Sequence, residues 1–461
     1  MGLRLRDRSL VTFVLIAAAM CAACGGQASP TKAGGTLVVD QNFAYDDLDP
    51  VIGSHQTAVL VDKCVYDTLL TIDPHDLSKP YPSLATSYTV SPDAKVFTFN
   101  LRHGVKFSSG NPLTSSDVVW SLQRLAVSGL RSGQNYPMIG MTVSASDPYT
   151  VVLTSNVPNP AVPITMTISN AGILDSVLVQ QNGGTTDIHD KAENFLNTSS
   201  AGSGPYVVAS VDRTGQIILK ANPNYWGAKP VYSTVIVRNA PPATQRFDVQ
   251  DGQAQVALDI PSQDAASLSS SKVNVTSAPT SDQFFLVVNA RASVLSFGPN
   301  QNFRDAVKYG LDYKGLVALG GSGAAQMTGF IPDGLLGSLP ISEAPQRDVA
   351  RAKAALAQLG VANPTVTLEF PTDRTWDGLS ITPFATKIQS DLKEVGITVN
   401  LRGEPNTVLD DRWTSGKVEL YLSANSADYP DAADFTGFQT IGGSDATAGG
   451  WWQAWTHPSM H

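Results

Sequence analysis

Cysteine is scarce in this sequence. Only three of the 461 residues are cysteines, and Cys21 and Cys24 lie close together near the N-terminus. Because Cys64 is the single remaining thiol, the chain has no disulfide framework and must rely on its hydrophobic core. Cys64 lies in a largely apolar stretch, so we expect it to be a buried small hydrophobic residue rather than a nucleophile.

Catalytic and metal-binding motifs are also missing. The six histidines form no H-E-x-x-H arrangement, and no C-x-x-C occurs beyond Cys21 and Cys24. Neither a G-x-S-x-G motif nor a Walker-type phosphate loop is present. Gly321-Ser322-Gly323 lacks the third glycine of a dinucleotide-binding loop and is expected to be an ordinary loop. We therefore expect no enzyme, cofactor or metal site, although a catalytic pair distant in sequence would leave no motif.

An excess of positive charge is absent as well. The chain carries 31 lysines and arginines against 40 acidic residues, a net charge of −9, and has no basic stripe. Such a chain is a poor nucleic-acid binder. Its length and its 42% of hydrophobic residues predict two or three structural units rather than one compact lobe.

The N-terminus has the order of a secretory signal. Arg4, Arg6 and Arg8 precede an uncharged apolar run over residues 10–20, and small residues follow it. The run is shorter than the roughly 20 residues that a helix needs to span a bilayer. We predict a signal peptide over residues 1–23.

The end of this signal resembles a bacterial lipobox. Ala22 and Ala23 precede Cys24, although Cys21 stands where the motif usually has leucine. We expect lipidation of Cys24 and a lipidated polar tether over residues 24–34. The alternative is an ordinary secreted protein in which a cysteine lies near the cleavage site by chance.

The front half of the chain has a pattern rich in strands. We predict a strand over residues 36–39, a helix over 60–70 and a hairpin over 85–107 that turns at 91–93. Thr114 is predicted to cap the next helix together with Asp117. Further strands are expected over 149–154 and 217–220.

The rear half alternates helices and strands. Apolar residues at helical spacing predict helices over 303–317, 349–359 and 382–395, the last capped by Thr382. Gly360 and Gly396 are predicted to end the second and third of these helices. Strands over 365–370 and 397–401 adjoin them. This alternation predicts an α/β lobe with a mixed or parallel sheet behind a β-rich portion, and a ligand would lie between the two.

Several ordered segments resemble a single family. In chain order they are Tyr66–Leu70, Pro82–Tyr88, Asp93–Phe107, Leu113–Arg124, Gly202–Tyr206, Asn222–Trp226, Phe303–Ala306, Leu311-Asp312, Gly396-Ile397 and Asp428–Asp431. Together they resemble family 5 of the extracellular solute-binding proteins, the oligopeptide-, dipeptide- and nickel-binding components of ABC importers. The resemblance extends from Gly35 onward.

The resemblance implies an α/β fold of the two-lobed, type II periplasmic-binding-protein kind, with mixed sheets, an extra subdomain and an interlobe ligand cleft. Residues 35–80 and 204–280 would form the N-terminal lobe. Residues 81–203 would form the added subdomain, and 281–461 the C-terminal lobe. Ligand would be held as the lobes close by hinge motion.

The resemblance also implies ligand-binding residues. Asp428 resembles the aspartate that pairs with a ligand's amino terminus, and Arg374 the arginine that meets its carboxylate. Tyr429 and Trp376 are candidates for stacking on the ligand. A fixed anion and a fixed cation in a dry cleft would recognise a zwitterion. The nickel branch is less favoured, because no histidine lies near these segments.

The implied protein is an exported monomer, lipid-anchored at the outer face of the cytoplasmic membrane. It would deliver peptides or peptide-like small solutes to an ABC permease with a cytoplasmic ATPase. Family members usually continue past the region matching 451–461, so we expect a truncated C-terminal lobe in which Trp451, Trp452 and Trp455 form an exposed patch. The alternatives are a cell-surface hydrolase and a binding-defective truncated receptor.

Overall fold

The computed structural model describes residues 34–43, 47–53, 55–73, 76–127, 136–268, 273–276, 282–333, 335, 337–373, 375–376, 378–432 and 434–435. The described residues fall into two compact units. The first unit takes in those up to 260 together with 268 and 273–274, and the second takes in 261–267 and those from 275 onward. The predicted signal peptide, Cys24 and the three C-terminal tryptophans lie outside the described residues.

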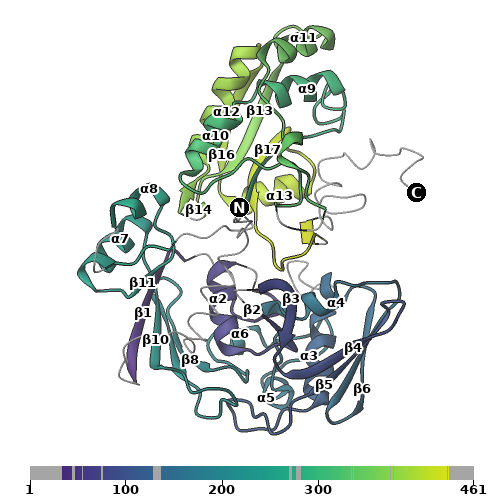
Figure 1. The fold of residues 1–461 in the computed structure, drawn as a ribbon, viewed down its shortest axis with the longest axis vertical. Helices are drawn as coiled ribbons and strands as arrows, with labels where there is room; N and C mark the ends of the chain where they lie inside the picture. The colour runs from purple at the N-terminus through teal and green to yellow at the C-terminus, as the bar shows by residue number, and fades with distance from the viewer. Residues whose placement is uncertain are drawn as a thin grey trace, which may run out of the picture. The chain divides into compact units, whose positions relative to one another are not determined.

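A mixed five-stranded sheet forms the centre of the first unit. Its strands, in spatial order, are β11 (Val256–Ala257), β1 (Gly35–Gln41), β10 (Tyr232–Asn239), β9 (Gln216–Ala221) and β8 (Tyr206–Val211). β1 runs parallel to β10 and β11, while β9 is antiparallel to its neighbours. Figure 1 shows β1 beside β10 although the two are far apart in the sequence.

Helix α2 (Gln56–Val65) contributes to the same core as this sheet. Leu37 and Val39 of β1 belong to one buried cluster with Val61 and Cys64 of the helix. Cys64 is thus the buried residue that its apolar surroundings predicted. The predicted bounds 60–70 were wrong, because the helix ends at Val65 and Leu70 already opens a strand.

A second, antiparallel sheet of the first unit has the order β4 (Ala85–Val90), β5 (Val96–Leu101), β7 (Thr150–Ser155), β6 (Met141–Asp147). The predicted hairpin is confirmed as β4 and β5, and Phe97 and Phe99 on its apolar face are fully buried. Helix α3 (Ser115–Leu125) packs on this sheet and has the predicted capping box between Thr114 and Asp117.

Shorter elements complete the first unit. They are β2 (Leu70–Asp73), β3 (Asp76–Pro82), α4 (Val162–Thr165), α5 (Ser176–Gln181), α6 (Glu193–Leu196), α7 (Pro242–Asp251) and the 3₁₀ turns η1 (Tyr136–Met138), η2 (Ser169–Ala171) and η3 (Ala266–Leu268), the last straddling the two units. A buried ion triad ties three segments of this unit together. Arg124 of α3 donates to Asp49 at 2.7 Å and to Asp190 at 2.9 Å.

The second unit is built from α-helices and a mixed β-sheet. Its sheet has the order β12 (Gln283–Val288), β17 (Leu420–Asn425), β13 (Thr365–Pro371), β16 (Thr398–Glu404), and a small hairpin joins β14 (Thr375–Trp376) to β15 (Leu379–Ser380). The helices are α8 (Ser262–Ala265), α9 (Gln301–Gly310), α10 (Tyr313–Gly320), α11 (Val349–Leu359), α12 (Thr382–Val395) and α13 (Asn406–Thr414), with the turn η4 (Ile341–Glu343). The predicted alternation of helices and strands is confirmed.

Two predicted helix boundaries differ in the second unit. The single helix expected over 303–317 is two helices, because the Asp312 side chain accepts the Gly315 N–H and begins α10. Thr382 is already helical in α12, and Ile381 takes the N-cap position that was predicted for Thr382. The predicted C-terminal stops at Gly360 and Gly396 are confirmed, since both residues are left-handed.

Candidate ligand-binding edge of the second unit

Three strands of the second unit end at one edge of the sheet. β13 runs parallel to both β16 and β17, so their carboxyl ends point the same way. In open α/β sheets ligands bind outside the carboxyl ends of the strands. The segment after β17 carries Asp428 and Tyr429, and the segment after β13 carries Trp376. The structure therefore brings three of the four predicted ligand residues to neighbouring strand ends.

The loop after β17 places its two predicted residues differently. The Asp428 side chain is exposed, whereas Tyr429 is 6% exposed. Burial, followed by the negative charges of Asp434, Asp431 and Asp428, raises the pKa of the Tyr429 phenol. The Asp431 N–H donates to the Tyr429 carbonyl at 2.9 Å, which makes the loop turn tightly. Asp428 is thus presented to solvent on an internally bonded loop.

Asp434 lies beneath this loop and was not among the predicted site residues. Its side chain is 3% exposed, and its Oδ2 accepts the Asp428 N–H at 3.0 Å. Its Oδ1 is buried without a hydrogen-bond partner. Burial, with smaller contributions from the charges of Asp428 and Asp431, raises the pKa of the Asp434 carboxyl well above its usual range. The acid is therefore held in its neutral form over a wider pH range than an exposed aspartate.

Trp376 lies inside the core of the second unit. It is 2% exposed, and its ring meets the edge of Phe284 at a centroid distance of 6.1 Å. Phe284 in turn stacks on Phe384 of α12 at 4.8 Å. In this arrangement the indole fixes the β14–β15 hairpin on the sheet. Stacking of Trp376 on a ligand stays a prediction.

Arg374 lies outside the described residues. Its neighbour Asp373 is described, and Asp373 Oδ1 accepts the Asn406 N–H at 2.8 Å at the start of α13. Helix α13 is held on β13 by Arg412, whose guanidinium binds both carboxylate oxygens of buried Glu369 at 2.6 and 2.7 Å. The segment between β13 and β14 is thus bordered by a helix that a charged pair fixes in place.

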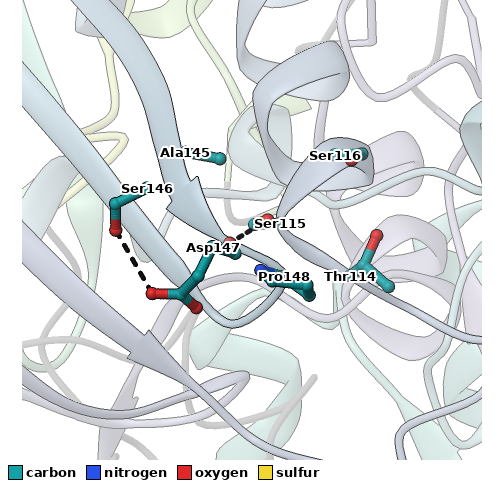
Figure 2. A pocket seen from close by; sticks show the side chains of 7 residues that line it. All are labelled: Thr114, Ser115, Ser116, Ala145, Ser146, Asp147 and Pro148. Carbon is teal, nitrogen blue, oxygen red and sulfur yellow. Dashed lines mark hydrogen bonds between the residues drawn. The ribbon is translucent and has the colours of Figure 1, made fainter.

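A depression of about 430 Å³ lies elsewhere, on the second sheet of the first unit. Figure 2 shows its lining residues, in which the hydroxyls of Ser115 and Ser146 donate to the backbone oxygen and the carboxylate of Asp147. Asp147 is exposed, and the hydrogen bond from the Tyr149 N–H lowers its pKa. The polar groups of Ser115, Ser146 and Asp147 in this depression are thus already bonded to one another.

Two kinds of feature are absent from the described residues. Within those ranges no group of three or more His, Cys, Asp or Glu side chains could hold a metal ion. None of the helices in the described part of the chain combines the length and apolarity needed to cross a membrane.

Comparison with known proteins decides the family. Residues 79–446 match the family model described as "Bacterial extracellular solute-binding proteins, family 5 Middle". The chain belongs to this family. Members of this family are the substrate-binding proteins of ABC peptide importers, and the resemblance predicted from the sequence is confirmed.

The relatives of this family-5 protein are binding proteins. A probable D,D-dipeptide-binding periplasmic protein of Escherichia coli is 28% identical over an alignment of 405 residues that covers 82% of this chain and 75% of the relative. Di/tripeptide-binding protein 2 of Pseudomonas aeruginosa is 26% identical over 453 residues, covering 94% of this chain and 83% of the relative. These similarities agree with the expectation of a binder rather than an enzyme.

Solved structures confirm the predicted fold class. A dipeptide-binding protein from Pseudoalteromonas in complex with Met-Leu has a TM-score of 0.76 at 19% identity and covers 92% of this chain and 86% of its own. A periplasmic binding protein from Helicobacter pylori in complex with the peptide STSA has a TM-score of 0.72 at 22% identity and covers 88% and 80%. The family-5 chain therefore has the type II periplasmic-binding fold with mixed sheets.

Proposed function

We propose that this chain is the lipid-anchored receptor of an ABC importer and captures small peptides or peptide-like solutes by closing two lobes. Lipidation at Cys24 would hold it at the outer face of the cytoplasmic membrane, where a monomer meets the permease. The proposed lobes are residues 35–80 with 204–280, and 281–461, with 81–203 as the added subdomain. Family membership and relatives that are named for dipeptides and tripeptides support this proposal.

The observation that carries the proposal is the position of Asp428. Asp428 is exposed beyond the carboxyl ends of parallel strands β13 and β17, and its own N–H is bound by buried Asp434. A backbone held in this way presents a fixed negative charge, which is what a peptide's ammonium group requires. We propose that Asp428 pairs with this ammonium, that Arg374 pairs with a ligand carboxylate, and that Trp376 and Tyr429 shape the apolar surroundings.

Asp428→Asn tests this role without removing the backbone N–H that binds Asp434. The probes are D-alanyl-D-alanine and L-methionyl-L-leucine, each compared with its N-acetyl form by calorimetry. A hydrogen bond between charged groups is worth about 1.5–3 kcal/mol, so Asp428→Asn should weaken binding of the free dipeptide roughly 10- to 100-fold. The variant should no longer distinguish free from acetylated probes.

Asp431→Asn is the matched control, since it removes the same charge from the same loop. We expect it to change the affinity for the free dipeptide little. Equal losses in both variants would mean that Asp428 acts only through the overall charge of the loop. Mass analysis of the recovered probe separates a binder, which returns it intact, from a cell-surface hydrolase.

A further inference from the structure

Asp434 combines burial with an unsatisfied oxygen. Of its two carboxyl oxygens, Oδ2 accepts the Asp428 N–H at 3.0 Å and Oδ1 is buried without a hydrogen-bond partner. The neighbouring Phe435 is fully buried and anchors the same segment. An ionised carboxylate in such a position would lack the donors that normally compensate its charge, whereas a neutral acid carries its proton on the free oxygen.

The charges around Asp434 also favour its neutral form. Asp428 and Asp431 face it from its own loop, and Tyr429 is a further acidic group there. At the adjoining end of β12, Asp282 accepts a hydrogen bond from the Ser426 hydroxyl. Among the described residues, the charges resolved as acting on Asp434 are both negative. A positive charge bound at Asp428 would therefore oppose the two negative charges that raise the pKa of Asp434.

We propose that Asp434 is a proton-linked positioning residue, which releases its proton when a cationic amine binds Asp428. This inference rests on the proposed function of Asp428. The acid loses one proton to solvent and becomes a carboxylate, and no other bond changes. Its Oδ2 accepts the Asp428 N–H in both states, so the loop stays positioned while it gains one negative charge that offsets the positive charge of the ligand.

Thermodynamic linkage between proton binding and ligand binding determines whether the affinity for the ligand rises or falls with pH. A bound ammonium favours the anionic form and lowers the pKa of Asp434, so the complex holds fewer protons than the free protein. Affinity must then increase as pH rises from the pKa of Asp434 in the complex to its pKa in the free protein, by at most about tenfold per pH unit. This increase in affinity ends at the latest where the ligand's own α-amino group loses its charge, at a pH of about 8.

Calorimetry in buffers of different ionisation enthalpy measures the proton release directly. With L-methionyl-L-leucine as the probe, the parent protein and the control Asp431→Asn should release a fraction of a proton per ligand at some pH between about 4, the ordinary value for an aspartate, and about 8, where the ligand amine loses its charge. Asp434→Asn keeps an acceptor for the Asp428 N–H and should bind without this release. Proton release that is absent from the parent, or equal in Asp434→Asn, would overturn the inference while leaving ligand binding at Asp428 intact.

A second experiment needs no ligand. Asp428→Asn removes the same negative charge that a bound ammonium would neutralise, so it should lower the pKa of Asp434. We compare the melting temperature of Asp434→Asn with that of its parent. The difference, variant minus parent, should rise with pH above the pKa of an aspartate in the unfolded chain and level off where folded Asp434 ionises. In the Asp428→Asn background the difference should level off at lower pH. Identical curves would refute the coupling even if no probe binds.

Discussion

At the scale of single residues, burial separates groups that look alike in the sequence. Asp428, Asp431 and Asp434 are spaced three apart in one acidic run, yet Asp428 is exposed and Asp434 is 3% exposed. The resemblance predicted Asp428 because that residue lies in a family motif. It gave no reason to select Asp434, because an aspartate in a polar run is usually solvated. The burial of Phe435 beside it shows that this segment of the chain enters the protein interior.

Trp376 allows a residue-scale prediction. Because its indole is 2% exposed in the core of the second unit, Trp376→Ala should leave a cavity and destabilise the protein by about 3–5 kcal/mol. Trp376→Phe keeps an aromatic ring against Phe284 and should lose much less. Thermal unfolding of both variants measures the difference. Equal and small losses would show that the ring is available to solvent or ligand rather than packed in the core.

At the scale of elements, the two helix ends marked by glycine were predicted correctly. Glycine at 360 and at 396 ends α11 and α12 as expected, with φ of 74° and 103°. The break between α9 and α10 was missed because Leu311 is buried and continues the apolar pattern across it. Periodicity records which face is buried, whereas a side-chain cap such as Asp312 decides where a helix begins.

Gly360 provides a test at this scale. A Cβ at this position would meet nothing within 4 Å, so a substitution acts on the backbone alone. Gly360→Ala should destabilise the protein by about 1 kcal/mol, because alanine resists the left-handed conformation. Gly360→Asn should cost less, since asparagine tolerates positive φ. Chemical unfolding of the two variants gives the comparison, and a neutral alanine variant would exclude this capping role.

At the scale of the whole molecule, the pattern of strands and helices was enough to predict a β-rich portion followed by an α/β portion. Both are present as the two compact units of the described chain. Their boundaries in the implied lobes, and the closure of these lobes, stay predictions. The chemistry of the ligand could not be predicted from these patterns, because sheet and helix periodicities describe burial and not the groups that a binding edge presents.

The central claim is that the chain binds a small solute through its amine and returns it unchanged. Native mass spectrometry tests this claim on the purified protein mixed with equimolar free and N-acetylated dipeptides and tripeptides. We expect a one-to-one complex with a free-amine peptide, and the peptide should be released with its mass unaltered. Equal retention of acetylated peptides, or release of shortened fragments, would contradict it.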